Sequence, residues 1–188
     1  MNISPHASRW LITLVLGPVL VWVLLWAPPP VFDAVVALAG LLAWREYFVI
    51  SFGRMIPRLM VVASLGWLLI VVGAVLGGIA GQQAALFAAM CGGGGYFLLN
   101  YERIPSIIDH IGRFALGHLY LSLFLSFLII LFALEQGRQW VLFSLVVTFL
   151  ADTAAFYVGR TWGRRFLYPA VSPKKPGRDW PAVSWGVD

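Results

Sequence analysis

The chain has 188 residues, of which 61% are apolar and 11% charged, and its mean hydropathy is +0.87. Soluble domains are nearer half apolar and a quarter charged, so this composition excludes both an ordinary water-soluble domain and a disordered chain. The single cysteine, Cys91, excludes a disulfide framework and a cysteine-based zinc site. The net charge is +5, but the basic residues lie in short segments between apolar runs. That pattern indicates membrane topology and headgroup contact rather than nucleic-acid binding.

A membrane-spanning helix needs about 20 mainly apolar residues. Six stretches approach that length and are separated by proline, glycine or polar breaks: Trp10–Ala27, Val31–Trp44, Leu59–Ala80, Ala84–Leu99, Phe114–Leu134 and Trp140–Gly159. The second stretch is short, and we expect it to continue through Tyr47 and Phe48. The break between the third and fourth is placed at Gly81-Gln82-Gln83, and residues 100–113 are expected to form an interfacial segment. The sequence therefore predicts an all-α polytopic membrane bundle of about six transmembrane spans.

The distribution of the thirteen basic residues predicts the orientation of these spans. If the N-terminus is cytoplasmic, every Lys and Arg except Arg138 falls in a cytoplasmic segment. Cytoplasmic loops of membrane proteins carry such an excess of basic residues. We therefore expect a cytoplasmic N-terminus, with the basic cluster after the sixth span on the same side.

Asp152 lies inside the predicted sixth span. A carboxylate at mid-membrane depth costs about 2.5–3.5 kcal/mol on insertion scales, so such residues usually have a functional role. Eight residues separate it from Arg160, which places it roughly 12 Å from the cytoplasmic end at about 1.5 Å per residue. A functional carboxylate and a neutral, hydrogen-bonded packing carboxyl both remain open. In either case we expect it to face protein or a polar cavity.

Other polar residues of the apolar stretches have simpler interpretations. Asp33 lies at the outer end of the second stretch, within reach of headgroups. Glu46 is expected to form an interfacial ion pair with Arg45. A lone histidine such as His118 is more often a packing residue than a ligand, and the glycines at 92–95 favour close helix approach over a phosphate-binding loop.

The end of the sixth span carries a longer pattern. It reads Ala-Asp152-Thr-Ala-Ala-Phe-Tyr-Val-Gly-Arg160, then Trp-Gly-Arg164-Arg, and then Leu-Tyr-Pro-Ala-Val-Ser172-Pro-Lys174-Lys175. In order and spacing this run resembles the phosphatidate cytidylyltransferase (CDP-diacylglycerol synthase) family. The resemblance extends more weakly towards Arg9.

The resemblance implies an enzyme that transfers CMP from CTP to phosphatidic acid, releasing pyrophosphate and forming CDP-diacylglycerol for phospholipid synthesis. It implies that Asp152 belongs to the active site and is a candidate ligand of Mg²⁺, the expected cofactor. It also implies that the phosphate-binding residues are Arg160, Arg164, Ser172, Lys174 and Lys175. The expected location is a bacterial inner membrane, as a multi-pass protein with its active face towards the cytoplasm.

The sequence departs from the family pattern after Lys175. The family continues with Thr-Trp-Glu-Gly and carries a later signature whose aspartates hold the metals, whereas this chain ends with residues 176–188. Restoring one base before the codon for Pro176 allows the reading Thr-Trp-Glu-Gly-Leu-Ala-Gly-Gly, which matches the family. We therefore expect a membrane domain over residues 1–175, incomplete relative to the family, and an aberrant, disordered tail over 176–188. This chain itself is expected to lack activity.

Two alternative functions remain at this stage. One is a non-catalytic multispan protein that binds lipid or assists assembly, and the other is a small transporter that uses Asp152 as a proton or ion site. A transporter would be favoured by paired intramembrane charges or by interrupted spans in corresponding halves, and the sequence displays neither. Whether the chain forms a homodimer is also left open.

Overall fold

The computed structural model describes residues 17–53, 55–104 and 106–162. By its internal contacts the chain divides into two units, residues 1–145 and 146–188. The predicted tail at 176–188 lies outside the described residues. Within the described ranges every regular element is helical, which confirms the predicted all-α class.

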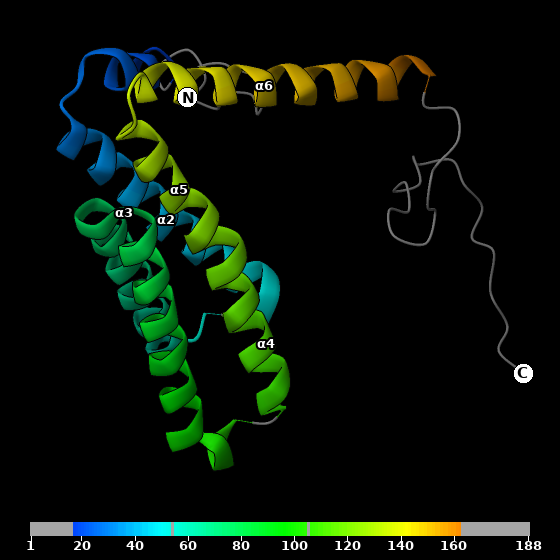
Figure 1. Cartoon of the computed structure of the whole chain (residues 1–188). Coiled ribbons are helices and arrows are strands. Elements are labelled where there is room, and N and C mark those ends of the chain that lie inside the picture. The colour runs from blue at the N-terminus through cyan, green and yellow to red at the C-terminus, as the bar shows by residue number, and fades with distance from the viewer. Residues whose placement is uncertain (1–16, 54, 105, 163–188) are drawn as a thin grey trace, which may run out of the picture. The chain divides into compact units, whose positions relative to one another are not determined.

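The elements follow one another with short connections (Figure 1). In chain order they are the helix Gly17–Trp26, α2 (Pro29–Phe52), α3 (Pro57–Leu99), the short 3₁₀ helix η1 (Tyr101–Arg103), α4 (Ile107–Gly117), the π-helical turn η2 (His118–Ser122), α5 (Leu123–Phe132) and α6 (Gly137–Trp162). Proline occupies the first turn of both α2 and α3, where its missing N–H costs nothing. Gly53 ends α2 with φ 65°, the left-handed conformation that glycine adopts at helix C-termini.

The 43 residues of α3 form two helices that fold back on each other, not one rod. The turn is at Gly78, whose φ of 56° and ψ of −139° are accessible to glycine and not to ordinary residues. Beyond the turn the two backbones come very close, since a Cβ added to Gly73 would lie 2.5 Å from the carbonyl oxygen of Gly81. The third and fourth predicted stretches are therefore an antiparallel helical hairpin.

The predicted position of this turn was wrong. The sequence placed it at residues 81–83 because glutamines are rare in apolar helices. In the structure Gln82 is fully buried within the second arm of the hairpin. Its Nε2 donates hydrogen bonds to Ser126 Oγ at 2.7 Å and to the Leu123 carbonyl at 3.2 Å. The side-chain N–H groups of Gln82 thus join α3 to α5, while its buried Oε1 has no hydrogen-bond partner among the described residues. The glutamine lies inside the helix and does not end it.

The charged segment before the fifth stretch also differs from its prediction. Residues from Ile107 onwards are already helical, and α4, η2 and α5 run on without interruption. Arg113 pairs with Asp109 at 2.8 Å and donates a hydrogen bond to the Ser51 carbonyl. The Tyr47 hydroxyl donates to the Arg113 carbonyl at 2.7 Å. The charges therefore satisfy the free carbonyls at the end of α2 instead of forming a separate interfacial segment.

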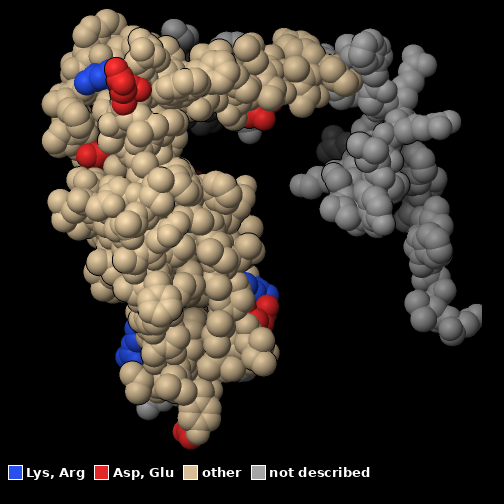
Figure 2. Space-filling model, viewed as in Figure 1, with Lys and Arg blue, Asp and Glu red and all other residues tan. Residues whose placement is uncertain are grey.

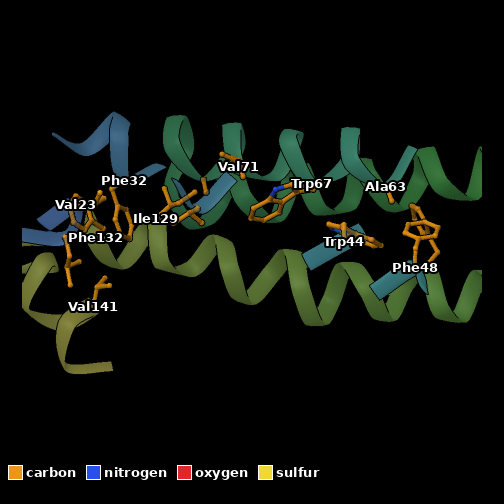
Figure 3. Packing of buried hydrophobic residues seen from close by; sticks show 14 of the residues in the cluster. Val23, Phe32, Trp44, Phe48, Ala63, Trp67, Val71, Ile129, Phe132 and Val141 are labelled. Atoms are coloured by element: carbon orange, nitrogen blue, oxygen red, sulfur yellow. The ribbon is translucent and has the colours of Figure 1, made fainter. Parts of the chain in front are cut away.

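Large aromatic side chains form the core of residues 17–145, where α3 packs against both α2 and α5 (Figure 3). Trp44, Trp67 and Phe48 are completely buried. The Trp67 indole lies against Gly40, whose missing side chain leaves room for the ring, and its N–H donates to the Ala37 carbonyl at 2.8 Å. Glycine on one helix and tryptophan on the next thus allow close packing with the indole N–H satisfied.

Three described helical stretches are long and apolar enough to cross a membrane: Pro29–Phe52, Pro57–Leu99 and Ile107–Phe132. On the face shown in Figure 2, charged side chains lie towards the two ends of the bundle formed by residues 17–145 and leave a wide middle band uncharged. Leu38, Leu65, Leu76 and Phe124 are among many large apolar side chains that are exposed. The protein is an integral membrane protein, while the count of six spans and the orientation stay predictions.

Arg138 is the one basic residue predicted to lie on the outer side of the membrane, and in the structure it stabilises the end of a helix. Its guanidinium donates to the carbonyls of Leu24, at 3.1 Å, and Ala27, at 2.7 Å, and lies 5.1 Å from the centre of the Phe132 ring. The Leu24 carbonyl lies in the last turn of the helix Gly17–Trp26 and the Ala27 carbonyl directly after it, where the helix itself supplies no partners. Arg138 therefore joins the first helix to the start of α6.

We expect Arg138→Gln to lower the free energy of unfolding by about 2 kcal/mol, because two charge-assisted hydrogen bonds and a cation–π contact are lost together. The measurement is the midpoint of thermal unfolding in detergent. Arg58→Gln is the matched control, since Arg58 is exposed at the start of α3. Equal midpoints for the two variants would contradict the role assigned to Arg138.

Candidate functional site

The residues predicted to carry the chemistry lie at the end of α6 and beyond it. Asp152 is on α6 and its side chain is exposed. Arg160 is on the same helix, but its side chain lies outside the described part of the chain. Arg164, Ser172, Lys174 and Lys175 also lie outside the described residues. The structure therefore places Asp152 and the Arg160 backbone on one helix and leaves the geometry of the set as a prediction.

Polar residues recur every fourth position along α6. Ser144, Thr148 and Asp152 are spaced at i, i+4 and i+8, so they follow one face of the helix. The Ser144 hydroxyl donates to the Trp140 carbonyl at 2.9 Å, which satisfies it within its own helix. The face ends with the carboxylate of Asp152, and Arg160 follows two further turns along the chain.

The described residues do not form a magnesium site. No three Asp, Glu, His or Cys side chains among them come close enough to hold a metal ion. Mg²⁺ is held by oxygen ligands with near-octahedral geometry, often one or two carboxylates together with substrate phosphates. Asp152 can supply one such oxygen donor, and the rest of the ligand set is not found in residues 17–53, 55–104 and 106–162. Magnesium remains a prediction from the resemblance.

The expected ion pair between Arg45 and Glu46 is absent. Both side chains are exposed, and within the described ranges neither forms an ion pair. Consecutive residues on a helix point about 100° apart, so neighbours in sequence do not face each other. The prediction failed because adjacency in sequence was taken for proximity of the charged groups.

A second polar cluster, which the sequence did not predict, is buried between α2, α3 and the α4–α5 helix. The Trp44 indole N–H donates to Ser122 Oγ at 3.0 Å, and Gln82 donates to Ser126 Oγ at 2.7 Å. His118 lies beside them, with its ring centre 4.7 Å from that of Trp44. His118, Ser122, Ser126 and Gln82 are all completely buried.

The π-helical turn η2 aligns this cluster. A π-turn inserts one extra residue into a helix and changes which side chains share a face, and such turns are often found at functional positions. Here it spans His118–Ser122. The Ser126 hydroxyl donates to the Ser122 carbonyl at 2.7 Å, one turn further on. The two serines can then serve two different partner helices, α2 through Trp44 and α3 through Gln82.

His118 packs in the core, as its isolated position in the sequence suggested. Its Nδ1 lies 3.2 Å from the Phe114 carbonyl, and its Nε2 faces the backbone of Gly66 without a hydrogen-bond partner. A side chain on Gly66 would meet that nitrogen at 2.6 Å. The sequence signal that was missed is the spacing of His118, Ser122 and Ser126, which recur every fourth residue within an otherwise apolar helix.

We expect Ser122→Ala to lower the free energy of unfolding by about 1–3 kcal/mol, because the buried Trp44 indole N–H is left without an acceptor. The test compares thermal unfolding midpoints in detergent for Ser122→Ala and Ser144→Ala. Ser144 is the control on a different helix, α6, where its hydroxyl donates to the Trp140 carbonyl one turn earlier in the same helix. If Ser122→Ala is no less stable than Ser144→Ala, the bond to Trp44 contributes nothing measurable.

Comparison with known proteins decides the family. Residues 7–177 match the cytidylyltransferase family, which covers most of the chain and includes all of the predicted site residues. The chain belongs to the cytidylyltransferase family. No solved structure matches it significantly.

Among curated proteins, this cytidylyltransferase family member is similar to three phosphatidate cytidylyltransferases. The Bacillus subtilis enzyme is 29% identical over 102 residues, which is 52% of this chain and 36% of the enzyme. The enzymes of Staphylococcus saprophyticus and Staphylococcus epidermidis (strain RP62A) are 39% and 37% identical over 41 residues, which is 22% of this chain and 16% of each enzyme. The matched part therefore spans about a third of the Bacillus relative and a smaller share, 16%, of each Staphylococcus relative.

Proposed function

We propose that this protein is a phosphatidate cytidylyltransferase, which joins CMP from CTP to phosphatidic acid and releases pyrophosphate. The observation that carries the proposal is the family match over residues 7–177, which includes Asp152 and the predicted phosphate-binding residues. The names of the similar curated enzymes support this choice of substrates. The apolar, membrane-embedded character of the chain suits a lipid substrate.

The proposed reaction is a substitution at the α-phosphorus of CTP. A phosphate oxygen of phosphatidic acid forms a bond to that phosphorus, and the bond to the oxygen bridging the α- and β-phosphates breaks. The electron pair leaves with pyrophosphate. Both reactants are anions, so catalysis depends mainly on holding them in line and on neutralising their charge.

The basic residues supply that neutralisation in the proposal. Arg160 and Arg164 offer guanidinium groups that bind phosphate with two parallel hydrogen bonds, and Lys174 and Lys175 offer compact positive charges. Ser172 contributes a hydroxyl donor. Asp152 would orient a positive group or a bound metal ion beside the phosphates, and magnesium, when bound, would add positive charge.

The membrane topology is part of the same proposal. CTP is a cytoplasmic metabolite with several negative charges, so the basic residues after α6 must face the cytoplasm to reach it. We propose six spans in a bacterial inner membrane with a cytoplasmic N-terminus, which is the orientation that leaves Arg138 on the outer side. Cysteine labelling with a membrane-impermeant reagent tests this, with Arg58→Cys protected and Gln136→Cys labelled in intact cells, both in a Cys91→Ala background.

The activity test uses two purified proteins in detergent with Mg²⁺: the 188-residue chain and the product read in the frame restored after Lys175. Each is incubated with phosphatidic acid and CTP, and the lipid extract is analysed by mass spectrometry for CDP-diacylglycerol. We expect the restored product to form it, and the 188-residue chain is assayed beside it for comparison. Replacing phosphatidic acid by diacylglycerol must abolish the product, since the attacking phosphate is then missing. No CDP-diacylglycerol from the restored protein would refute the proposed function and favour a non-catalytic lipid-binding role.

A further inference from the structure

A groove runs across the surface where α2 ends and α3 begins. It consists of two hollows of about 290 and 370 Å³ that share Met55. The first is lined by Arg45, Glu46, Val49, Ile50 and Met55, and the second by Met55, Pro57, Met60, Val61, Ser64 and Leu65. Ligand sites typically occupy roughly 300–1,000 Å³, so the two hollows together have the size of a small-ligand site. We call these residues the α2–α3 groove.

The groove is charged at one end and apolar along the rest. Arg45 and Glu46 are both exposed and, within the described residues, neither forms an ion pair. Ile50 is 81% exposed, and Val61 and Leu65 are exposed by 58% and 62%. A cation and an anion that line the same hollow without pairing with each other, followed by an uncovered apolar surface, are complementary to an amphiphile whose head carries both charges.

The depth of the groove in the membrane suits a phospholipid. At about 1.5 Å per residue the 24 residues of α2 measure roughly 36 Å, which exceeds the hydrocarbon thickness of about 30 Å. The excess of roughly 6 Å is about four residues, so the last turn of α2 reaches the headgroup region, where the phosphates of lipids lie. The long Arg45 side chain, about two turns before that end, can extend its guanidinium towards the same level. The apolar residues of α3 that line the groove continue from that level into the hydrocarbon.

We propose that the α2–α3 groove binds a zwitterionic phospholipid with a primary amine in its headgroup, of the phosphoethanolamine type. The lipid phosphate accepts hydrogen bonds from the Arg45 guanidinium, and the lipid ammonium pairs with the Glu46 carboxylate. One acyl chain lies over Met55, Met60 and Leu65. An anionic headgroup fits less well, because its second negative charge or its neutral polyol would face Glu46 without a cationic partner. The proposal uses none of the residues proposed for CMP transfer and does not depend on that activity.

The test is native mass spectrometry of the detergent-purified 188-residue chain with dioleoyl-phosphatidylethanolamine or dioleoyl-phosphatidylglycerol. We expect phosphatidylethanolamine to bind more tightly, and Arg45→Gln to weaken it by about tenfold, the loss expected of one charge-assisted hydrogen bond. Glu46→Gln should abolish the preference between the two lipids. Arg58→Gln is the matched control, because Arg58 is an exposed arginine at the start of α3 that does not line the groove. It should bind both lipids as the wild type does.

A second measurement does not depend on the variants folding. Phosphatidylethanolamine with a photoreactive group in one acyl chain should cross-link to the segment Pro57–Leu65 of the wild-type chain. Cross-links confined to other helices, equal affinity for the two lipids, or loss of binding in Arg58→Gln as large as in Arg45→Gln would each overturn the proposal. So would efficient disulfide-linked dimers of Val61→Cys in a Cys91→Ala background, because a second copy would then occupy the groove.

Discussion

Replacing Gly81 by leucine should open the α3 hairpin and lower the free energy of unfolding by about 3 kcal/mol. A Cβ at this position would overlap the carbonyl oxygen of Gly73 in the opposite arm. Both sides of the contact are backbone, so no side chain can rotate away, and overpacking of this kind falls at the upper end of the usual cost. Separating the arms also pulls Gln82 away from Ser126, which removes a buried hydrogen bond.

The control for this experiment is Gly92→Leu, on the same arm of the hairpin. A Cβ on Gly92 meets nothing within 4 Å, and the residue is exposed. Both substitutions gain the same helix propensity, so their difference isolates the close approach of the two backbones. The readout is the thermal unfolding midpoint in detergent. Equal midpoints for Gly81→Leu and Gly92→Leu would mean that the arms do not meet at Gly73 and Gly81.

If the proposed function holds, Asp152→Asn should lower the rate of CDP-diacylglycerol formation by the frame-restored product by about a hundredfold or more. Asparagine keeps the size of the side chain and removes its charge, so the change tests the electrostatic role of the carboxylate. Preorganised charges in a site that excludes water typically contribute 10²–10³-fold to rate. The measurement is kcat and KM for CTP in detergent, with unfolding midpoint as the check on folding.

Asp33→Asn is the matched control for Asp152→Asn. Asp33 is a carboxylate near the start of α2, at the predicted outer end of the bundle, and is not among the proposed site residues. We expect it to leave kcat and KM unchanged. If Asp152→Asn keeps the wild-type kcat while its stability falls, Asp152 is a packing carboxyl and not part of the site.

The lengths of the apolar stretches and the breaks between them were sufficient to predict the helical class and most helix positions, because a helix that crosses a membrane requires a long apolar run. Two of the errors in the prediction share one cause. Gln82 was taken for a turn signal, and the segment at Asp109 and Arg113 for an interfacial stretch, because both are polar. In the structure each polar group finds a partner on another helix, Gln82 on α5 and Arg113 on α2. Such partners are far apart in sequence and cannot be read from local patterns.

The buried cluster of Trp44, His118 and Ser122 illustrates the same limit. Its members come from α2 and from the helix of residues 107–132, and their alignment depends on the π-helical turn η2. No local propensity indicates where a helix gains an extra residue in one turn. The motif from Asp152 to Lys175 was in contrast visible in sequence, because its residues are consecutive in the chain. Its identification rests on the order of those residues, and the family match over residues 7–177 agrees with it.

The most direct test of CMP transfer follows the label from CTP. The restored product is incubated with phosphatidic acid and CTP carrying ³²P either at the α- or at the γ-phosphate, and the lipid is extracted. The account predicts that α-label enters the lipid phase as CDP-diacylglycerol, while γ-label stays in the aqueous phase as pyrophosphate. Gamma-label in the lipid would show transfer of the terminal phosphate instead, and an unlabelled lipid phase in both reactions would contradict the cytidylyltransferase assignment.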